Sequence, residues 1–374
     1  NSIAETISTK KSGRRDFLKM LGFSVSAAAV AAACEMPVRK SIPYVIKPEE
    51  ITPGVPNYYA STYAKGGNYN SVLVKTREGR PILLEGNKSS KISNGGVDAK
   101  SYASLLNLYD EKARIKQPLI DGKATDWKTA DSHVAKKLSE AVSKGQEIVL
   151  LSGTVLSPST KKVVAQFQSA YPNAEWIQYD AISASGLLDA NQENFGKRAI
   201  PEYHFDNADL IVGIGADFLG TWISPTEFSA DYAKGRKLSA TNKKMSRHVQ
   251  VESIPTLTGS NADLRIPVMP SQEALALLKL YNLVASATGN TTLSDSSNFE
   301  NAKLKEVAKE LVNARGKSIV VSGSNSKEVQ LLTNAINEML GNYGKTITWD
   351  RSSYYKQGDE TKLTSFLADL KGSK

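Results

Sequence analysis

Potential metal ligands and nucleophiles are few and widely separated in this sequence of 374 residues. Cys34 is the only cysteine, and the three histidines are His133, His204 and His248. None of the histidines belongs to an HExxH or similar metal-binding pattern, so each is expected to be structural or exposed. A single cysteine also excludes an intrachain disulfide and any cysteine-rich zinc or iron–sulfur site formed by this chain alone.

Two Ser-Gly pairs occupy positions at which parallel sheets bind phosphates. Ser152-Gly153 and Ser322-Gly323 each follow an apolar segment typical of a buried strand, and phosphates bind at such strand ends beside helix N-termini. Neither pair belongs to a GxGxxG or GxxxxGK(S/T) motif, which disfavours ordinary dinucleotide or P-loop binding. No GxSxG occurs, so a serine hydrolase has no support.

Four aspartates lie at turns or strand ends: Asp98, Asp110, Asp180 and Asp217. Turn and cap roles are commoner than catalysis for aspartate in such places. The residue types and their spacing therefore define no evident active site.

An alternation of strands and helices, beginning near Asp126, must position these residues. Asp126 is expected to cap a helix that ends at Gly145. Ser157 and Pro158 are expected to open the next helix. Further strand patterns and one helix pattern follow at 147–153, 175–180, 207–217, 244–253, 264–268 and 270–284.

An internal repeat indicates the fold class. Residues 147–180 and 317–350 have equal length and the same plan of apolar strand, Ser-Gly, helix and second strand. Such strand–helix–strand units build parallel, doubly wound sheets with right-handed crossovers. The sequence therefore predicts an α/β protein with two Rossmann-like domains.

A smaller β-rich region is expected before these domains. Residues 71–87 alternate apolar and polar residues around the turn 77–80, which predicts a β-hairpin. Residues 47–70 are rich in Pro, Gly, Asn and Tyr, a composition typical of an ordered loop. Residues 97–110 have a helical pattern.

The composition is that of an ordinary globular protein with an excess of basic residues. The formal net charge is +9 at pH 7, but the lysines are scattered and form no basic run with interleaved aromatics. Nucleic acid is therefore not expected as a partner, and a solvated surface or contact with an anionic membrane fits better.

The first 40 residues have the pattern of an export signal. Arg14 and Arg15 precede an apolar run from Met20 to Ala33, which ends at Cys34 in a lipobox-like sequence. Cleavage before Cys34 would allow its lipidation and a membrane tether; without cleavage, Cys34 would be a small apolar residue of a retained helix. Because the sequence starts at Asn1 and closes on an amphipathic helix, we expect the front part of a longer protein.

Several segments resemble the oxidoreductases that bind molybdenum through a bis-molybdopterin guanine dinucleotide. Residues 71–87 and 95–110 resemble the opening of that family, and residues 207–217 and 262–277 resemble its cofactor-contacting segments. Residues 34–62 and 203–228 are most similar to the twin-arginine-exported iron–sulfur subunit of bacterial alternative complex III. This resemblance implies a respiratory, quinol-oxidising complex.

The sequence departs from the family where its catalytic members bind an iron–sulfur cluster. Residues 57–70 contain no cysteine, and the later ligand position is Asp98, followed by a retained Lys100. Neither Asp, Tyr nor Ser replaces a thiolate in an ordinary cluster. The resemblance therefore implies a lost cluster site.

The molybdenum site also differs. Alignment places Ser183 at the usual Cys or selenocysteine ligand, and Asp217-Phe218 and Glu273 in the two cofactor-contacting motifs. Asp217 would face an anionic, phosphate-rich cofactor, and Phe218 would crowd it. We expect Asp98, Lys100, Ser183, Asp217 and Glu273 to be vestigial positions, with no cofactor or metal in this chain.

These inferences predict four segments: a signal or anchor segment at 1–40, a β-rich domain at 41–115, a first α/β domain at 116–300, and the start of a second at 301–374. The chain would be a structural scaffold on the periplasmic face of the bacterial inner membrane. Its partners would be multi-haem cytochrome c subunits and polytopic quinol-binding subunits, with iron–sulfur clusters beyond Lys374.

Two alternatives remain open at this point. One is an active molybdopterin oxidoreductase domain with Ser183 as the metal ligand, since serine binds molybdenum in some branches of the family. The other is a periplasmic binding protein that uses the cleft between its α/β domains.

Overall fold

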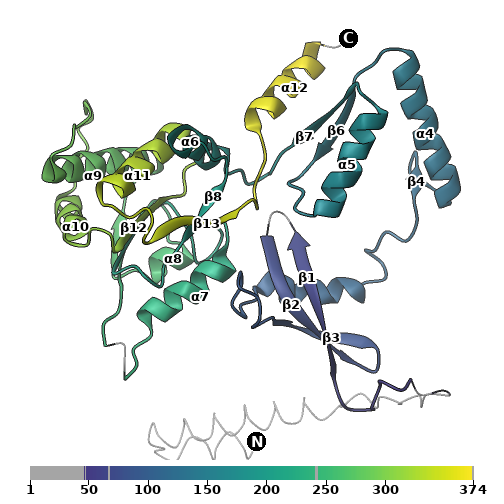
Figure 1. Cartoon of the computed structure of the whole chain (residues 1–374), viewed down its shortest axis with the longest axis horizontal. Helices are drawn as coiled ribbons and strands as arrows, with labels where there is room; N and C mark the ends of the chain where they lie inside the picture. The colour runs from purple at the N-terminus through teal and green to yellow at the C-terminus, as the bar shows by residue number, and fades with distance from the viewer. Residues whose placement is uncertain (1–45, 47, 66–67, 241–242, 373–374) are drawn as a thin grey trace, which may run out of the picture. The chain divides into compact units, whose positions relative to one another are not determined.

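A computed structural model describes residues 46, 48–65, 68–240 and 243–372. The chain divides into two compact units, Asn1–Ile51 and Thr52–Lys374, and the second contains nearly all of the described residues (Figure 1). The export signal, with Arg14, Arg15 and Cys34, lies outside the described residues. Among the residues that are described, no helix has the length and apolar character needed to cross a membrane.

A three-stranded antiparallel sheet begins the second unit. It contains β1 (Asn57–Lys65), β2 (Asn68–Arg77) and β3 (Arg80–Gly86), in that order. Positive φ angles at Glu78 (52°) and Gly79 (75°) form the tight turn between β2 and β3, which confirms the predicted hairpin. The expectation of a loop over 47–70 was wrong, because the Tyr-rich residues 57–65 pair along their whole length with β2.

Short elements connect this sheet to the α/β region: α3 (Ala99–Ser104), the 3-10 helix η1 (Leu105–Leu108), and the strands β4 (Leu119–Ile120) and β5 (Lys123–Ala124). The helix α4 (Trp127–Ser143) starts at Asp126, whose carboxylate accepts a hydrogen bond from the Thr129 backbone N–H at 2.9 Å. The predicted N-cap is confirmed.

The first copy of the repeat forms a parallel strand–helix–strand unit. It consists of β6 (Ile148–Ser152), α5 (Pro158–Ala170) and β7 (Ala174–Gln178), and β6 pairs directly with β7. Ser157 caps α5 by accepting from the Thr160 backbone N–H, and Pro158 is the first helical residue, as predicted.

The larger α/β region is built on a four-stranded parallel sheet in the order β11-β10-β9-β12. Strands β9, β10 and β11 follow one another outward, and the chain then returns to place β12 on the other side of β9. The elements are α6 (Ser185–Phe195), β8 (Ile200–Tyr203), β9 (Leu210–Ile214), α7 (Pro225–Arg236), β10 (Arg247–Glu252), α8 (Leu257–Ser260), β11 (Leu264–Pro267), η2 (Pro270–Gln272), α9 (Glu273–Thr288), α10 (Ala302–Asn313), β12 (Ser318–Ser322), α11 (Lys327–Met339), β13 (Ile347–Ser353) and α12 (Glu360–Gly372).

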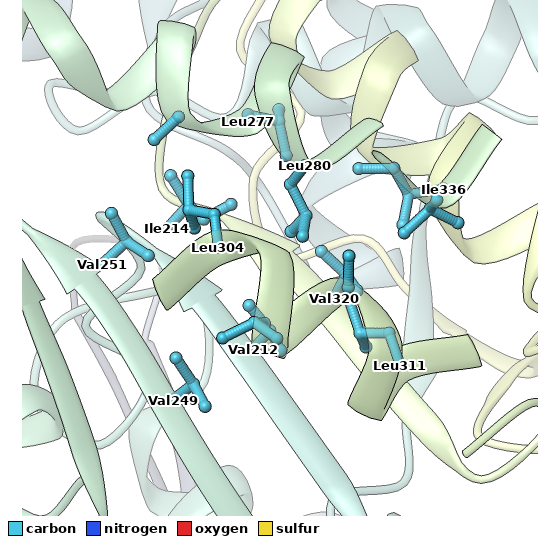
Figure 2. Close-up of a cluster of buried hydrophobic side chains, with 14 of the residues drawn as sticks. Val212, Ile214, Val249, Val251, Leu277, Leu280, Leu304, Leu311, Val320 and Ile336 are labelled. Atoms are coloured by element: carbon cyan, nitrogen blue, oxygen red, sulfur yellow. The ribbon is translucent and has the colours of Figure 1, made fainter. Parts of the chain in front are cut away.

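Alternate residues of these strands supply two hydrophobic cores, because successive strand side chains point to opposite faces. Val212 and Val320 pack with α9, α10 and α11 on one face, as Figure 2 shows. Ile211 and Ile319 pack on the other face with α6, α7 and β8. Helices therefore cover both faces of the sheet, which is the doubly wound arrangement.

The predicted boundary between residues 300 and 301 was wrong. Strand β12 forms backbone hydrogen bonds with β9 and belongs to the first large sheet. The second copy of the repeat also differs from the first, because β13 pairs antiparallel with β8 instead of lying beside β12. A tight turn after α11 redirects the chain: the Asn342 carbonyl accepts from the backbone N–H groups of Lys345, Thr346 and Ile347.

Candidate functional site

A small cavity lies where the sheet reverses its strand order, at the carboxyl ends of β9 and β12. Open α/β sheets bind ligands at this switch point. The cavity has a volume of about 140 Å³. Its lining includes the residues that follow the two strands and the start of α6: Ser183, Ala184, Gly215, Asp217, Gly323, Ser324 and Asn325.

Two glycines form a floor without side chains. Gly215 has a φ of +62°, and the Gly323 backbone N–H donates to the Ile214 carbonyl at 2.9 Å. A Cβ atom on Gly323 would lie 2.1 Å from the Gly215 carbonyl oxygen, so no side chain fits there. Gly323 of the pair Ser322-Gly323 thus lines the cavity, whereas Ser152-Gly153 lies at the end of β6 in the separate two-stranded sheet.

Asp217 lines the cavity, but its carboxylate is engaged by neighbouring loops. Its Oδ1 accepts from the backbone N–H of Thr258 at 3.1 Å and from the Thr258 hydroxyl at 2.7 Å. Its Oδ2 accepts from the Thr221 hydroxyl at 3.1 Å. These bonds join the loop after β9 to α8, so Asp217 acts as a structural clamp.

The expectation that Phe218 would crowd a ligand was wrong. Phe218 is fully buried and stacks on Phe205 with 4.6 Å between ring centroids and 16° between ring planes. Its side chain belongs to the core on the α6 and α7 face of the sheet. Alternation along the chain explains this result, because Asp217 and Phe218 are neighbours that point in different directions.

Glu273 reaches the same place from the first residue of α9. Its Oε1 accepts from the Ser253 backbone N–H at 3.0 Å. Its Oε2 lies 2.5 Å from where a Cβ atom on Gly215 would be. Glu273 therefore fills the space that the glycine leaves open.

Ser183 is committed to the start of α6. Its hydroxyl oxygen accepts from the Ser185 backbone N–H at 3.0 Å and lies 3.1 Å from the Ser185 hydroxyl. Ser185 in turn donates to the Gly358 carbonyl at 2.9 Å. The predicted ligand position thus supports a helix start and its contact with the segment before α12.

Lys356 was missed by the sequence interpretation. It lines the cavity with only 6% of its surface exposed, and its Nζ donates to the Ile182 carbonyl at 2.9 Å. Burial lowers the pKa of this ammonium group. A lone lysine carries no pattern that distinguishes it from surface lysines, so the sequence offered no signal for it.

A second cavity of about 790 Å³ shares Ile182, Thr221 and Lys356 with the first. Asp98 and Lys100 line it, so four of the five predicted positions line two neighbouring cavities, and Glu273 lies against Gly215 of the first. Asp98 caps α3 by accepting from the Ser101 backbone N–H.

The histidines do not converge on either cavity. His133 is exposed on α4, and His204 lies 2.9 Å from the Thr348 hydroxyl. His248 is buried beside Tyr232, with 3.1 Å between the ring nitrogen and the hydroxyl oxygen. In the described ranges, no three His, Cys, Asp or Glu residues are grouped so that they could hold a metal ion.

The groups around the first cavity do not fit a molybdenum centre held by a pterin dinucleotide. The side chain at the ligand position is the Ser183 hydroxyl, which already accepts a backbone hydrogen bond. Asp217 lines the cavity and Glu273 lies against Gly215, so two carboxylates lie close to the place an anionic cofactor would occupy, and like charges repel at short range.

Comparisons with known proteins agree with a distant relationship to molybdopterin proteins. No family model matches the chain. The chain is 24% identical over 250 residues to the menaquinone reductase, molybdopterin-binding-like subunit, of Nitratidesulfovibrio vulgaris, with 61% of this chain and 33% of that protein covered. The chain thus spans about one third of the length of the curated relative it matches. Its sequence is molybdopterin oxidoreductase-like.

Two solved structures have distantly similar folds. Acetylene hydratase from Pelobacter acetylenicus matches with a TM-score of 0.46 and 15% identity, covering 77% of this chain and 42% of that chain. The formyltransferase/hydrolase complex from Methylorubrum extorquens matches with a TM-score of 0.41 and 16% identity, covering 62% and 59%. Similarities at this level carry no functional argument.

Proposed function

We propose that this chain is a cofactor-free structural domain of a quinone-linked respiratory oxidoreductase of the alternative complex III type. The similarity to a molybdopterin-binding-like subunit of a menaquinone reductase supports the respiratory assignment. The observation that carries the structural role is that polar side chains at the switch-point cavity already form hydrogen bonds or contacts within the fold. There Asp217 joins two loops, Glu273 fills the space beside Gly215, and the Ser183 hydroxyl accepts from the Ser185 backbone N–H.

The proposed role is to scaffold an assembly on the periplasmic face of the inner membrane. Electrons would pass through iron–sulfur clusters in sequence beyond Lys374, multi-haem cytochrome c subunits and quinol-binding membrane subunits. The segment that contains Arg14, Arg15 and Cys34 would export the chain and hold it at the membrane. No electron-transfer step is assigned to a residue of this chain.

Metal analysis combined with native purification tests the proposal. We expect the purified complex to contain haem proteins and polytopic membrane subunits, with molybdenum far below one equivalent per chain. Molybdenum near one equivalent would overturn the cofactor-free role. Recovery of the chain alone, under conditions that preserve membrane complexes, would support a free-standing binding protein instead.

Substitution of Ser183 separates the structural role from the active molybdoenzyme. Ser183→Ala should leave quinol oxidation by the intact complex within about twofold of the wild type, because the hydroxyl only supports the start of α6. A loss of activity of 100-fold or more, with the complex still assembled, would show that Ser183 is a catalytic ligand.

A further inference from the structure

A third cavity, of about 450 Å³, lies beside β13 and shares no lining residue with the switch-point cavity. Three aromatic rings line it together with a carboxylate and a guanidinium group: Tyr69, Tyr354, Tyr355, Glu227 and Arg351. Its volume lies within the range of small-molecule sites. None of these residues has a role in the cavities described above.

An irregularity in β13 brings Arg351 to this cavity. The register with β8 shifts between Thr348 and Ser353, and such bulges redirect side chains. Arg351 donates to the Lys91 carbonyl at 2.8 Å and pairs with the carboxylate of Glu202. Because the Glu202 side chain is only 7% exposed, this pair neutralises the charge of Arg351 within the protein.

Glu227 has no comparable partner. It lies in the first turn of α7 and forms a side-chain hydrogen bond with Ser224. Within the described ranges, no Lys, Arg or His forms an ion pair with it at 4.0 Å or less. The charged groups around it are Asp231 on α7, Glu202 on β8 and Arg351 on β13. Glu202 pairs with Arg351, and Asp231 pairs with Lys234 at 2.7 Å, which leaves Glu227 without a cation of its own. Burial raises the pKa of Glu227 to about 7.

Tyr355 adds an independent sign of a missing partner. Its ring stacks on Tyr69 with 6.1 Å between centroids, and only 9% of its surface is exposed. In the part of the chain that the structure describes, its buried hydroxyl has no hydrogen-bond partner. Buried tyrosine hydroxyls are normally satisfied, so this one is available to a polar group bound in the cavity.

We propose that this cavity binds an organic cation, a guanidinium or primary alkylammonium group. The cation would donate hydrogen bonds to the Glu227 carboxylate and the Tyr355 hydroxyl, and its charge would lie against the tyrosine rings. Aromatic faces attract cations, and a desolvated carboxylate completes the charge. An anion would meet the Glu227 carboxylate, because Arg351 is already paired with Glu202 and Lys234 with Asp231.

Calorimetric titration of the purified full chain with butylguanidinium tests this proposal. Butylurea is the matched control because it has nearly the same shape without the charge. We expect butylguanidinium to bind about tenfold more tightly at pH 8 than at pH 6, because the fraction of ionised Glu227 rises over that range. Butylurea should bind at least tenfold more weakly at pH 8.

Three variants identify the groups responsible. Glu227→Gln should weaken binding at pH 8 at least tenfold and remove the pH dependence. Tyr355→Phe should weaken it a few-fold, because it removes only the hydroxyl. Glu306→Gln, on the exposed side of α10, should bind like the wild type. Circular dichroism confirms that each variant is folded.

Three outcomes would overturn the proposal. These are equal binding of butylurea and butylguanidinium, unchanged binding by folded Glu227→Gln, and no binding to the folded wild type at millimolar concentration. Unchanged binding by Tyr355→Phe would refute the role of its hydroxyl.

Discussion

Asp217 and Thr258 are joined by two hydrogen bonds to one carboxylate oxygen, from the Thr258 backbone N–H at 3.1 Å and from its hydroxyl at 2.7 Å. The Thr258 hydroxyl itself accepts from the Leu219 backbone N–H at 2.9 Å. This connection closes the loop after β9 against α8. It shows that an acidic residue at the switch point holds two loops of the fold together.

Removal of this clamp should destabilise the protein. Asp217→Ala leaves the buried backbone N–H and hydroxyl of Thr258 without their acceptor, at a cost of about 2 kcal/mol. Combined with Thr258→Val in a double-mutant cycle, it should show a coupling energy of about 1 kcal/mol. Urea denaturation of the four proteins measures both values, and strict additivity would refute the clamp.

Lys356 makes the opposite kind of contribution to stability. Its burial penalises the charged ammonium group, whose pKa is lowered. Lys356→Met keeps an unbranched side chain of similar length and removes that penalty together with the hydrogen bond to the Ile182 carbonyl, so the two effects should offset and the free energy of unfolding should change by less than about 1 kcal/mol. Thermal denaturation at pH 7 checks this expectation, and a loss of more than about 1 kcal/mol would contradict it.

His248 predicts a specific loss of stability in acid. Burial lowers the pKa of His248 from 6.5 to about 4, while Arg236, Asp263 and Glu252 are the charged groups around it. The unfolded chain therefore binds a proton at a higher pH than the folded protein does. This contribution to stability is complete above pH 6.5 and falls by about 3 kcal/mol as the pH drops to 4.

A His248→Gln variant isolates this effect from other titrating groups. The difference in unfolding free energy between wild type and variant should shrink as the pH falls from 7 to 4. Urea denaturation at several pH values measures it. A difference that stays constant over this range would show that His248 is protonated equally in both states.

The core between the sheet and α9 should be sensitive to loss of volume. Leu280 is fully buried among β-strand and helix side chains (Figure 2). Leu280→Ala should cost about 2–5 kcal/mol, whereas Leu106→Ala should change stability by less than about 0.5 kcal/mol, because Leu106 is 70% exposed. Equal effects in thermal denaturation would contradict this core.

Local features of the fold were predictable because they depend on neighbouring residues. The caps at Asp126 and Ser157 and the turn at Glu78-Gly79 all follow from side chains within a few residues. Strand β1 was missed because its pairing with β2 outweighs the loop-like composition around it. The place of β12 was missed because it depends on β9, about a hundred residues earlier in the chain.

The candidate site was predictable only in part for the same reason. Ser183, Asp217 and Glu273 were chosen from local motifs, and the structure places them around the ends of β9 and β12. The irregular end of β13 and the segment after it bring Lys356 to the switch-point cavity and Tyr355 to the third cavity, beside Glu227. No periodicity in the sequence records such long-range contacts.

The contact between Gly215 and Gly323 has a consequence for evolution. Because a Cβ atom on Gly323 would lie 2.1 Å from the Gly215 carbonyl oxygen, the packing of two strand ends alone excludes every larger residue there. Selection for folding would preserve this glycine in descendants that have lost every ligand. A glycine pattern typical of a nucleotide site can therefore persist after nucleotide binding is lost, and in such a lineage the pattern indicates common descent and not binding.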